Sequence, residues 1–173
     1  LRYAHFSGAR VVELGTGAGF PGLPLAILRS DARFTLLDSQ QKRIDFLQDT
    51  VSRLGLKNVE CVCLRAEEAP PEYRESFDIV TSRAVARLNV LAELCLPFVK
   101  LGGSFIAMKA LDCEEERQEA QNAAHELGGS FPDLRRYDIP FSDTGRALIV
   151  IGKAAPTPAK YPRRWAKITK QPL

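Results

Sequence analysis

The chain has 173 residues, enough for one domain with a substantial core, and its hydrophobic (45%) and charged (26%) fractions are typical of soluble proteins. No apolar run reaches the roughly 18–20 residues that a membrane helix needs, and no signal peptide is visible, so the sequence predicts a cytoplasmic protein. Because the chain starts at Leu1 and its only methionine is Met108, we expect residues to be missing before Leu1.

The charges are unevenly distributed. The formal net charge is +3, but residues 144–173 hold seven of the 24 basic residues and none of the 21 acidic ones. Such a segment predicts contact with a polyanion, although a solvated tail that only aids solubility would look the same. We therefore divide the chain into a domain over residues 1–155 and a basic C-terminal tail over residues 156–173.

Short apolar runs alternate with helical patterns along the first two thirds of the chain. The predicted strands are Val11–Leu14, Phe34–Leu37, Val59–Leu64, Phe77–Thr81 and Ser104–Met108. The predicted helices are Leu23–Arg29, Gln41–Leu54, Leu88–Val99 and Glu114–Leu127, the last with Asp112 as a possible cap. The strands are nearly continuous in apolar residues, and this βαβ order indicates a parallel sheet with helices on both faces.

The pattern changes after Gly128. Leu134–Ile139 and Ala147–Ile151 read as strands joined by the polar turn Phe141–Gly145. Strands joined by so short a turn are antiparallel neighbours, so the predicted fold class is α/β, Rossmann-like, with a mostly parallel sheet and one antiparallel strand near its edge. Pro156 and Pro158 then end regular structure.

A glycine-rich turn follows the first strand, in the stretch "VVELGTGAGFPGLPLAI". A phosphate loop is excluded, because Leu23 and Pro24 stand where its lysine and hydroxyl residue would be. Gly17, Gly19 and Gly22 match the dinucleotide fingerprint literally. However, the strand ends at Leu14, before Gly15, and Pro21 removes a backbone donor where a pyrophosphate needs one.

The third candidate ligand is S-adenosylmethionine. Glu13 to Gly19 reads E-x-G-x-G-x-G, and the glycines let the backbone pass close to a ligand. Glu13 can help to hold the ammonium group, and Asp38, at the end of the second strand, can accept hydrogen bonds from both ribose hydroxyls. Asp38 suits a dinucleotide equally well, and it could instead cap the helix at Gln41. Adenine contacts would fall at residues 65–68, and the methyl group would meet its substrate at residues 82–84.

The cysteines and histidines give no sign of a metal site. Cys61, Cys63, Cys95 and Cys113 lack metal-ligand spacing and are predicted to be buried free thiols. His5 and His125 have no evident nucleophile or metal partner, and we expect structural or surface roles for both.

Six segments resemble one known family in the right order. They are "ELGTGAGFPGLPLAI", "LLDSQQKRIDFLQ", "RAEE", "FDIVTSRAVARLNVLAELCLP", "GGSFIAMKA" and the tail "PTPAKYPRR". Together they resemble the bacterial small-subunit ribosomal RNA guanine-N7 methyltransferases, also called glucose-inhibited division protein B, from Val11 to Leu173. Glu13 stands where that family usually has Asp, and Ala166 stands where its tail often has Gly.

The resemblance implies a class I methyltransferase fold, S-adenosylmethionine as cofactor, and as substrate one guanine in the 530 loop of 16S ribosomal RNA. Guanine N7 carries a lone pair and no proton, so no catalytic base is expected and the protein has only to position the reactants. With the glycine-turn analysis, the candidate cofactor-binding residues are Glu13, Gly15, Gly17, Gly19, Phe20, Asp38, Ala66, Glu67 and Arg83.

Basic residues at strand ends and in the tail are the candidates for RNA contact. These are Arg83, Arg87, Lys109, Lys160, Arg163, Arg164, Lys167 and Lys170. We expect the tail to grip phosphates while lying apart from the glycine-turn edge, with Trp165 packed back onto the fold. The partner is then 16S ribosomal RNA or the small ribosomal subunit, with no membrane and no need for an oligomer.

Three rival functions remain open at this point. One is a methyltransferase with a small-molecule or protein substrate, against which the acid-free tail argues. The second is a dinucleotide-binding oxidoreductase. The third is a non-catalytic module that binds RNA.

Overall fold

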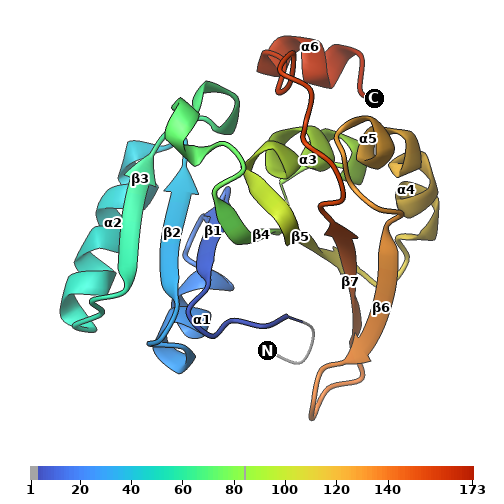
Figure 1. The fold of residues 1–173 in the computed structure, drawn as a ribbon. Coiled ribbons are helices and arrows are strands. Elements are labelled where there is room, and N and C mark those ends of the chain that lie inside the picture. Colours follow the sequence, from blue (N-terminus) through green and yellow to red (C-terminus); the bar gives the residue numbers. More distant parts are fainter. Residues whose placement is uncertain (1–3, 84) are drawn as a thin grey trace.

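The computed structural model describes residues 4–83 and 85–173, and a single sheet of seven strands forms its centre (Figure 1). The strands are β1 (Arg10–Leu14), β2 (Arg33–Asp38), β3 (Val59–Cys63), β4 (Phe77–Arg83), β5 (Val99–Ala110), β6 (Asp133–Asp138) and β7 (Gly145–Gly152). Their order is β3-β2-β1-β4-β5-β7-β6, and β7 runs antiparallel to both of its neighbours. The prediction of a mostly parallel sheet with one reversed strand near its edge is confirmed.

Helices cover both faces of this sheet. They are α1 (Gly22–Leu28), α2 (Gln41–Arg53), α3 (Leu88–Cys95), α4 (Glu114–Glu119), α5 (Gln121–Glu126) and α6 (Trp165–Lys170). Neighbouring residues of a strand point to opposite faces. Accordingly, Val11 packs with Ala26 of α1, whereas Val12 joins the cluster that contains α3 and α5. The strands are apolar on both faces because both faces are covered.

Two predicted helices differ from the observed ones. The helix expected at Leu88–Val99 ends at Cys95, because Pro97 has no backbone N–H to continue the hydrogen-bond ladder. The helix expected at Glu114–Leu127 is divided at Ala120 into α4 and α5. Asp112 is not its cap: the N-cap position is Cys113, and no side chain caps the helix.

The thiol prediction is only half correct. All four cysteines are free, but only Cys95 and Cys113 are buried. Cys61 is half-buried and Cys63 is exposed, because β3 is an edge strand.

Among the residues that the structure describes, no helix has the length and hydrophobicity of a membrane span.

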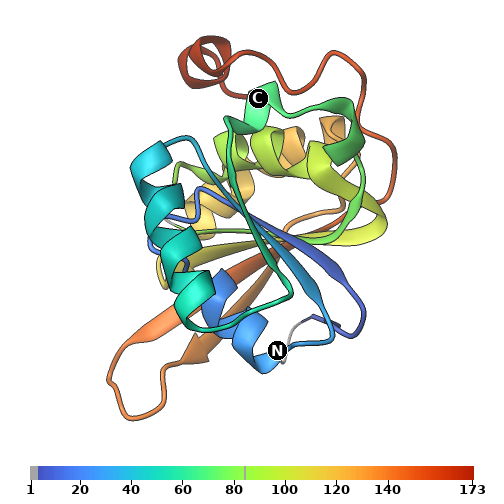
Figure 2. The ribbon, with the colours of Figure 1, turned by 90° about the vertical axis from the view of Figure 1, so that its left-hand side faces the viewer.

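The tail returns to the carboxyl ends of the parallel strands. In Figure 1, α6 lies beyond the end toward which β2 points, and Figure 2 shows the same helix above α3. Tyr161 and Ile168 belong to the main hydrophobic cluster, and Ile168 is fully buried. The tail is therefore packed onto the domain, and its helix is held at the edge where the glycine turn lies.

Candidate functional site

A cavity of about 330 Å³ opens at the carboxyl ends of the first four strands. Its lining includes Gly15 after β1, Asp38 at the end of β2, Ala66 and Glu67 after β3, and Ser82 in β4. Ligands of open α/β sheets bind at this edge, outside the carboxyl ends of the strands. Four of the predicted cofactor-binding residues are thus brought together in one cavity.

The glycine turn adopts a backbone that other residues rarely take. Gly15, Gly17 and Gly19 have φ values of +68°, +59° and +87°. A β-carbon at Gly17 would meet nothing within 4 Å, so the turn is open there to a ligand. At Gly19 a β-carbon would clash with Leu23 and Leu47, so this glycine serves close packing against the core instead of lining the cavity.

Asp38 is the best-positioned acid of the cavity. Its carboxylate is almost fully buried and accepts hydrogen bonds from the backbone N–H groups of Gly17 and Gln40, each at 3.0 Å. The guanidinium of Arg43 adds an ion pair at 3.1 Å. The alternative role as N-cap of α2 is wrong, because that position is Gln40 and no side chain caps the helix. Two backbone amides therefore fix the carboxylate, while the half-exposed Arg43 can leave it to an incoming ligand.

Glu13 lies behind the glycine turn with one unused acceptor. Its Oε2 accepts hydrogen bonds from Thr16 Oγ1 at 2.9 Å and from the N–H of Gly22 at 2.8 Å. Its Oε1 is buried without a partner, as is Oγ1 of Thr81, its register neighbour on β4. Burial raises the pKa of Glu13 to about 7, against the lowering effects of Thr16, Gly22 and Arg83. A cationic group of a ligand that reached Glu13 could donate a hydrogen bond to this unpartnered Oε1.

The raised pKa of Glu13 predicts a pH-dependent stability. The folded protein binds this proton more tightly than the unfolded chain does, so the stabilisation is complete below pH 4.5 and is lost as the pH rises through 7. Glu13→Gln should flatten the curve of unfolding free energy against pH, by up to about 3 kcal/mol across this range. Urea unfolding between these pH values measures the effect, with the exposed Glu60→Gln as control. Parallel curves for wild type and Glu13→Gln would contradict it.

Comparisons with known proteins agree with this geometry. Residues 1–133 match the family model GidB, rRNA small subunit methyltransferase G. A ribosomal RNA small subunit methyltransferase G of Deinococcus radiodurans is 49% identical, covering 100% of this chain and 70% of the relative. Another from Clostridium perfringens strain 13 is 47% identical, covering 94% of this chain and 69% of the relative. The chain belongs to the GidB family.

Solved structures of other proteins share the fold of this GidB family member. A predicted O-methyltransferase of Agrobacterium tumefaciens superposes with a TM-score of 0.71 at 18% identity, over 88% of this chain and 77% of the other. TYW2 of M. jannaschii, solved in complex with AdoMet, gives a TM-score of 0.68 at 16% identity, over 86% and 69%. The fold is that of the class I S-adenosylmethionine-dependent methyltransferases.

Of the remaining predicted cofactor residues, Glu13 and Gly19 line neither the cavity nor the groove beside it. Phe20 and Arg83 line a neighbouring groove, where the Arg83 guanidinium carbon is 6.0 Å from the centre of the Phe20 ring. Gly17 lines the same groove, and Gly15 lines both spaces. Ala84, part of the segment where methyl group and substrate were expected to meet, lies outside the described residues.

Two of the three strand-end cations that were predicted to contact RNA already form ion pairs within the protein. Arg87 forms an ion pair with Glu119, the last residue of α4. The largely buried Lys109 pairs with Glu116 of the same helix at 2.6 Å and donates to the carbonyl oxygen of Ala86 at 2.9 Å. The helix α4 therefore neutralises both, and of the three strand-end cations only Arg83 has no ion-pair partner among the described residues.

The tail cations also divide into two groups. The Nε of Arg163 donates to Oε1 of the fully buried Glu93 at 2.7 Å, and Nη2 of Arg163 forms an ion pair with Oε2 of the same carboxylate. Nη2 also donates to the carbonyl oxygen of Gln171 at 3.0 Å. Lys160 pairs with Glu126 at 3.0 Å. The exposed side chains without an ion-pair partner in the described chain are Arg164, Lys167 and Lys170. Arg163 thus has a structural partner where an RNA phosphate was expected.

Trp165 joins the tail to the cofactor cavity, a contact that the sequence did not predict. Its side chain is 38% exposed and lines the cavity together with Gly15 and Asp38. The expectation that the tail lies apart from the glycine-turn edge is therefore wrong. The sequence carries no local sign of this contact, because it depends on the anchoring of the tail at Glu93, which is 70 residues away from Arg163 along the chain.

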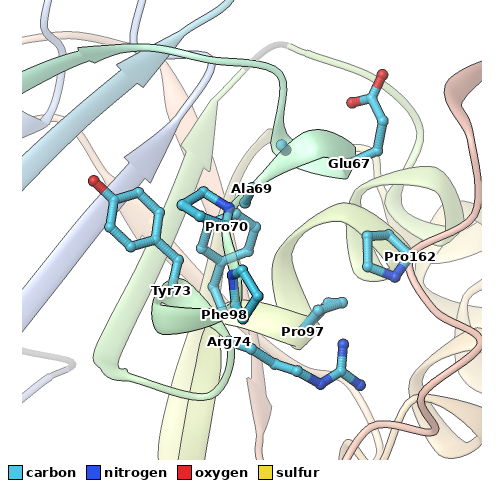
Figure 3. A pocket seen from close by; sticks show the side chains of 10 residues that line it. Glu67, Ala69, Pro70, Tyr73, Arg74, Pro97, Phe98 and Pro162 are labelled. Atoms are coloured by element: carbon cyan, nitrogen blue, oxygen red, sulfur yellow. The ribbon is translucent and has the colours of Figure 1, made fainter.

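A smaller cavity of about 220 Å³ marks the seam between tail and domain (Figure 3). It shares Ala66 and Glu67 with the main cavity. Figure 3 shows Pro162 of the tail on one side and Pro70 on the other. The guanidinium of Arg74 points toward the tail and donates to the carbonyl oxygens of Thr157 at 2.6 Å and Tyr161 at 2.7 Å. Arg74 therefore fastens the tail beside the cofactor cavity.

Proposed function

We propose that this protein transfers a methyl group from S-adenosylmethionine to N7 of a guanine in the 530 loop of 16S ribosomal RNA. The observation that carries the proposal is the 47–49% identity to small-subunit ribosomal RNA methyltransferases over nearly the whole chain. The cavity geometry supports it independently, because the buried Asp38 and the glycine turn at Gly15 meet at the ligand edge of the sheet.

The residues present fit S-adenosylmethionine. The two acids match two polar groups of the cofactor: Asp38 would accept the ribose hydroxyls, and the unpartnered Oε1 of Glu13 would accept from the ammonium group, directly or through water. Gly15 lines the cavity and Gly17 lines the groove beside it, and Ala66 and Glu67 would flank the adenine. The cofactor supplies an electrophilic methyl group on a sulfonium.

The chain has only to position the guanine. N7 carries a lone pair and no proton, so none of the side chains has to act as a base. Correct placement of two reactants is worth roughly 7–11 kcal/mol when fully realised. Because N7 must keep its lone pair free, cationic side chains at the site would hold O6 or phosphates, and Arg83 is the strand-end cation available for this.

The basic tail supports a polyanionic substrate. Arg164, Lys167 and Lys170 are exposed on or beside α6, which lies at the same edge as the cavity. Phosphates of RNA bound there would neutralise charges that no acid of residues 144–173 offsets. We propose that the protein acts as a monomer on ribosomal RNA in the bacterial cytoplasm.

Nucleoside analysis tests the proposal directly. A strain that lacks this protein should lose 7-methylguanosine at one position of its small-subunit RNA, and purified protein with radiolabelled S-adenosylmethionine should restore it on 30S subunits. Persistence of the modification would contradict the assigned product. Transfer to a small molecule or protein, but not to RNA, would favour the other methyltransferase function.

A further inference from the structure

An open groove of about 580 Å³ lies beside the cofactor cavity, between the glycine turn and α2. It shares Gly15 and Arg43 with the cavity, so occupants of the two spaces would meet at the glycine turn. Its other main walls are Phe20, Lys42, Phe46 and Arg83. We call it the α2 groove.

Two aromatic rings are exposed in the α2 groove. Phe20 of the glycine turn is 50% exposed, and Phe46 of α2 is 55% exposed. Phe46 follows Lys42 by one helical turn, so the ring and the ammonium group share one face of α2. Exposed rings beside cations are the usual means by which proteins stack unpaired bases and hold the adjoining phosphates.

The charge of the α2 groove also fits nucleic acid. Lys42, Arg43 and Arg83 line it, and no acidic residue is among its described lining residues. Arg43 is engaged by Asp38, whereas Lys42 has no ion-pair partner in the part of the chain that the structure describes. A bound cofactor at the shared glycine turn would account for Phe20 and Arg83, but it would leave Phe46 and Lys42 on α2 without a function.

We propose that the α2 groove binds a single-stranded nucleotide of the ribosomal RNA substrate, with its base on Phe46 and its phosphate at Lys42. This assignment rests on the proposed function and adds two substrate-binding residues to it.

Two substitutions on α2 test the α2 groove. Phe46→Ala should raise the half-saturating concentration of unmethylated 30S subunits roughly 5- to 150-fold, since a base stack is lost. Lys42→Gln should lower the salt slope of that half-saturation by about 0.7, as expected for one lost phosphate contact on a single strand. Affinity for S-adenosylhomocysteine, measured by calorimetry, should stay within twofold of wild type, and Phe46→Tyr should retain most of the subunit affinity.

Matched controls come from the same chain. Phe131 is 51% exposed beside Arg117, and Lys57 is an exposed lysine at the opposite edge of the sheet, so Phe131→Ala and Lys57→Gln should leave both measurements unchanged. Thermal unfolding checks that each variant is folded. Loss of cofactor affinity in the α2 variants with normal subunit kinetics would assign the groove to the cofactor and overturn the proposal.

The two proposals can fail separately. If the wild type methylates 30S subunits and the α2 variants do so equally well, the α2 groove is not the substrate site and the proposed function stands. If the wild type transfers no methyl group to 30S subunits or their RNA, the proposed function fails and the groove assignment falls with it.

Discussion

Replacing Asp38 with alanine is expected to weaken S-adenosylmethionine binding by roughly 10²- to 10⁴-fold, because two hydrogen bonds to a charged acceptor contribute about 1.5–3 kcal/mol each. The carboxylate is 2% exposed and is held by the N–H groups of Gly17 and Gln40 at 3.0 Å. A ribose bound at this strand end would lose its acceptor in a site with little water to replace it. Isothermal titration calorimetry with S-adenosylmethionine measures the loss.

Two further variants show whether this loss is specific. Asp49→Ala removes an exposed carboxylate from the same chain region, one that only pairs with Arg53 at 2.8 Å, and should bind the cofactor normally. Arg43→Ala removes the cation that occupies Asp38 in the structure, so binding should be as tight as in wild type or tighter. A dissociation constant for Asp38→Ala within threefold of wild type would mean that Asp38 does not bind the ribose.

Replacing Arg163 with alanine is expected to lower the free energy of unfolding by about 3–5 kcal/mol, because the buried Glu93 is then left without its counter-charge. Glu93 is fully buried and also accepts a hydrogen bond from the backbone N–H of Arg163 at 2.9 Å. The expected loss is a large fraction of the stability of an ordinary domain. Denaturant unfolding with linear extrapolation measures it.

The neighbouring arginine provides the control. Arg164 is exposed without an ion-pair partner in the described chain, so Arg164→Ala should change stability by no more than about 0.5 kcal/mol. The double variant Glu93→Gln/Arg163→Ala should recover part of the loss, because no buried charge remains unpaired. Equal stabilities of the two single arginine variants would contradict an anchoring role for Arg163.

Anchoring of the tail also links the proposed cofactor and RNA sites. Trp165 follows Arg163 closely and lines the cofactor cavity, while Arg164 and Lys167 point their charges outward at the same edge. Release of the tail would therefore disturb the cofactor cavity as well as the position of the exposed tail charges. This is why the paired Arg163 is a poor probe of RNA contact, and why Arg164 and Lys167 are better ones.

Local sequence patterns were enough to predict a mostly parallel sheet and its ligand edge. Each parallel strand is a short apolar run, and each helix that connects two strands shows its own apolar stripe, so periodicity predicted the succession of elements along the chain and the direction of the strands, but not the order of the strands in the sheet. The glycine turn and Asp38 come directly after strands, and the carboxyl ends of parallel strands meet at one edge. Their meeting in one cavity followed from topology alone.

Which charged side chains remain free to bind a ligand became known from the packed structure. Arg87 and Lys109 are paired by α4, and Arg163 is paired by Glu93 from α3, a residue that sequence periodicity marks only as part of a packed helix. The position of Trp165 at the cavity and the exposure of Phe46 in the α2 groove likewise depend on contacts between distant segments. Local sequence fixes which face of a helix is apolar, but ion pairs and cavities form between elements, so their members are known only when the elements are packed.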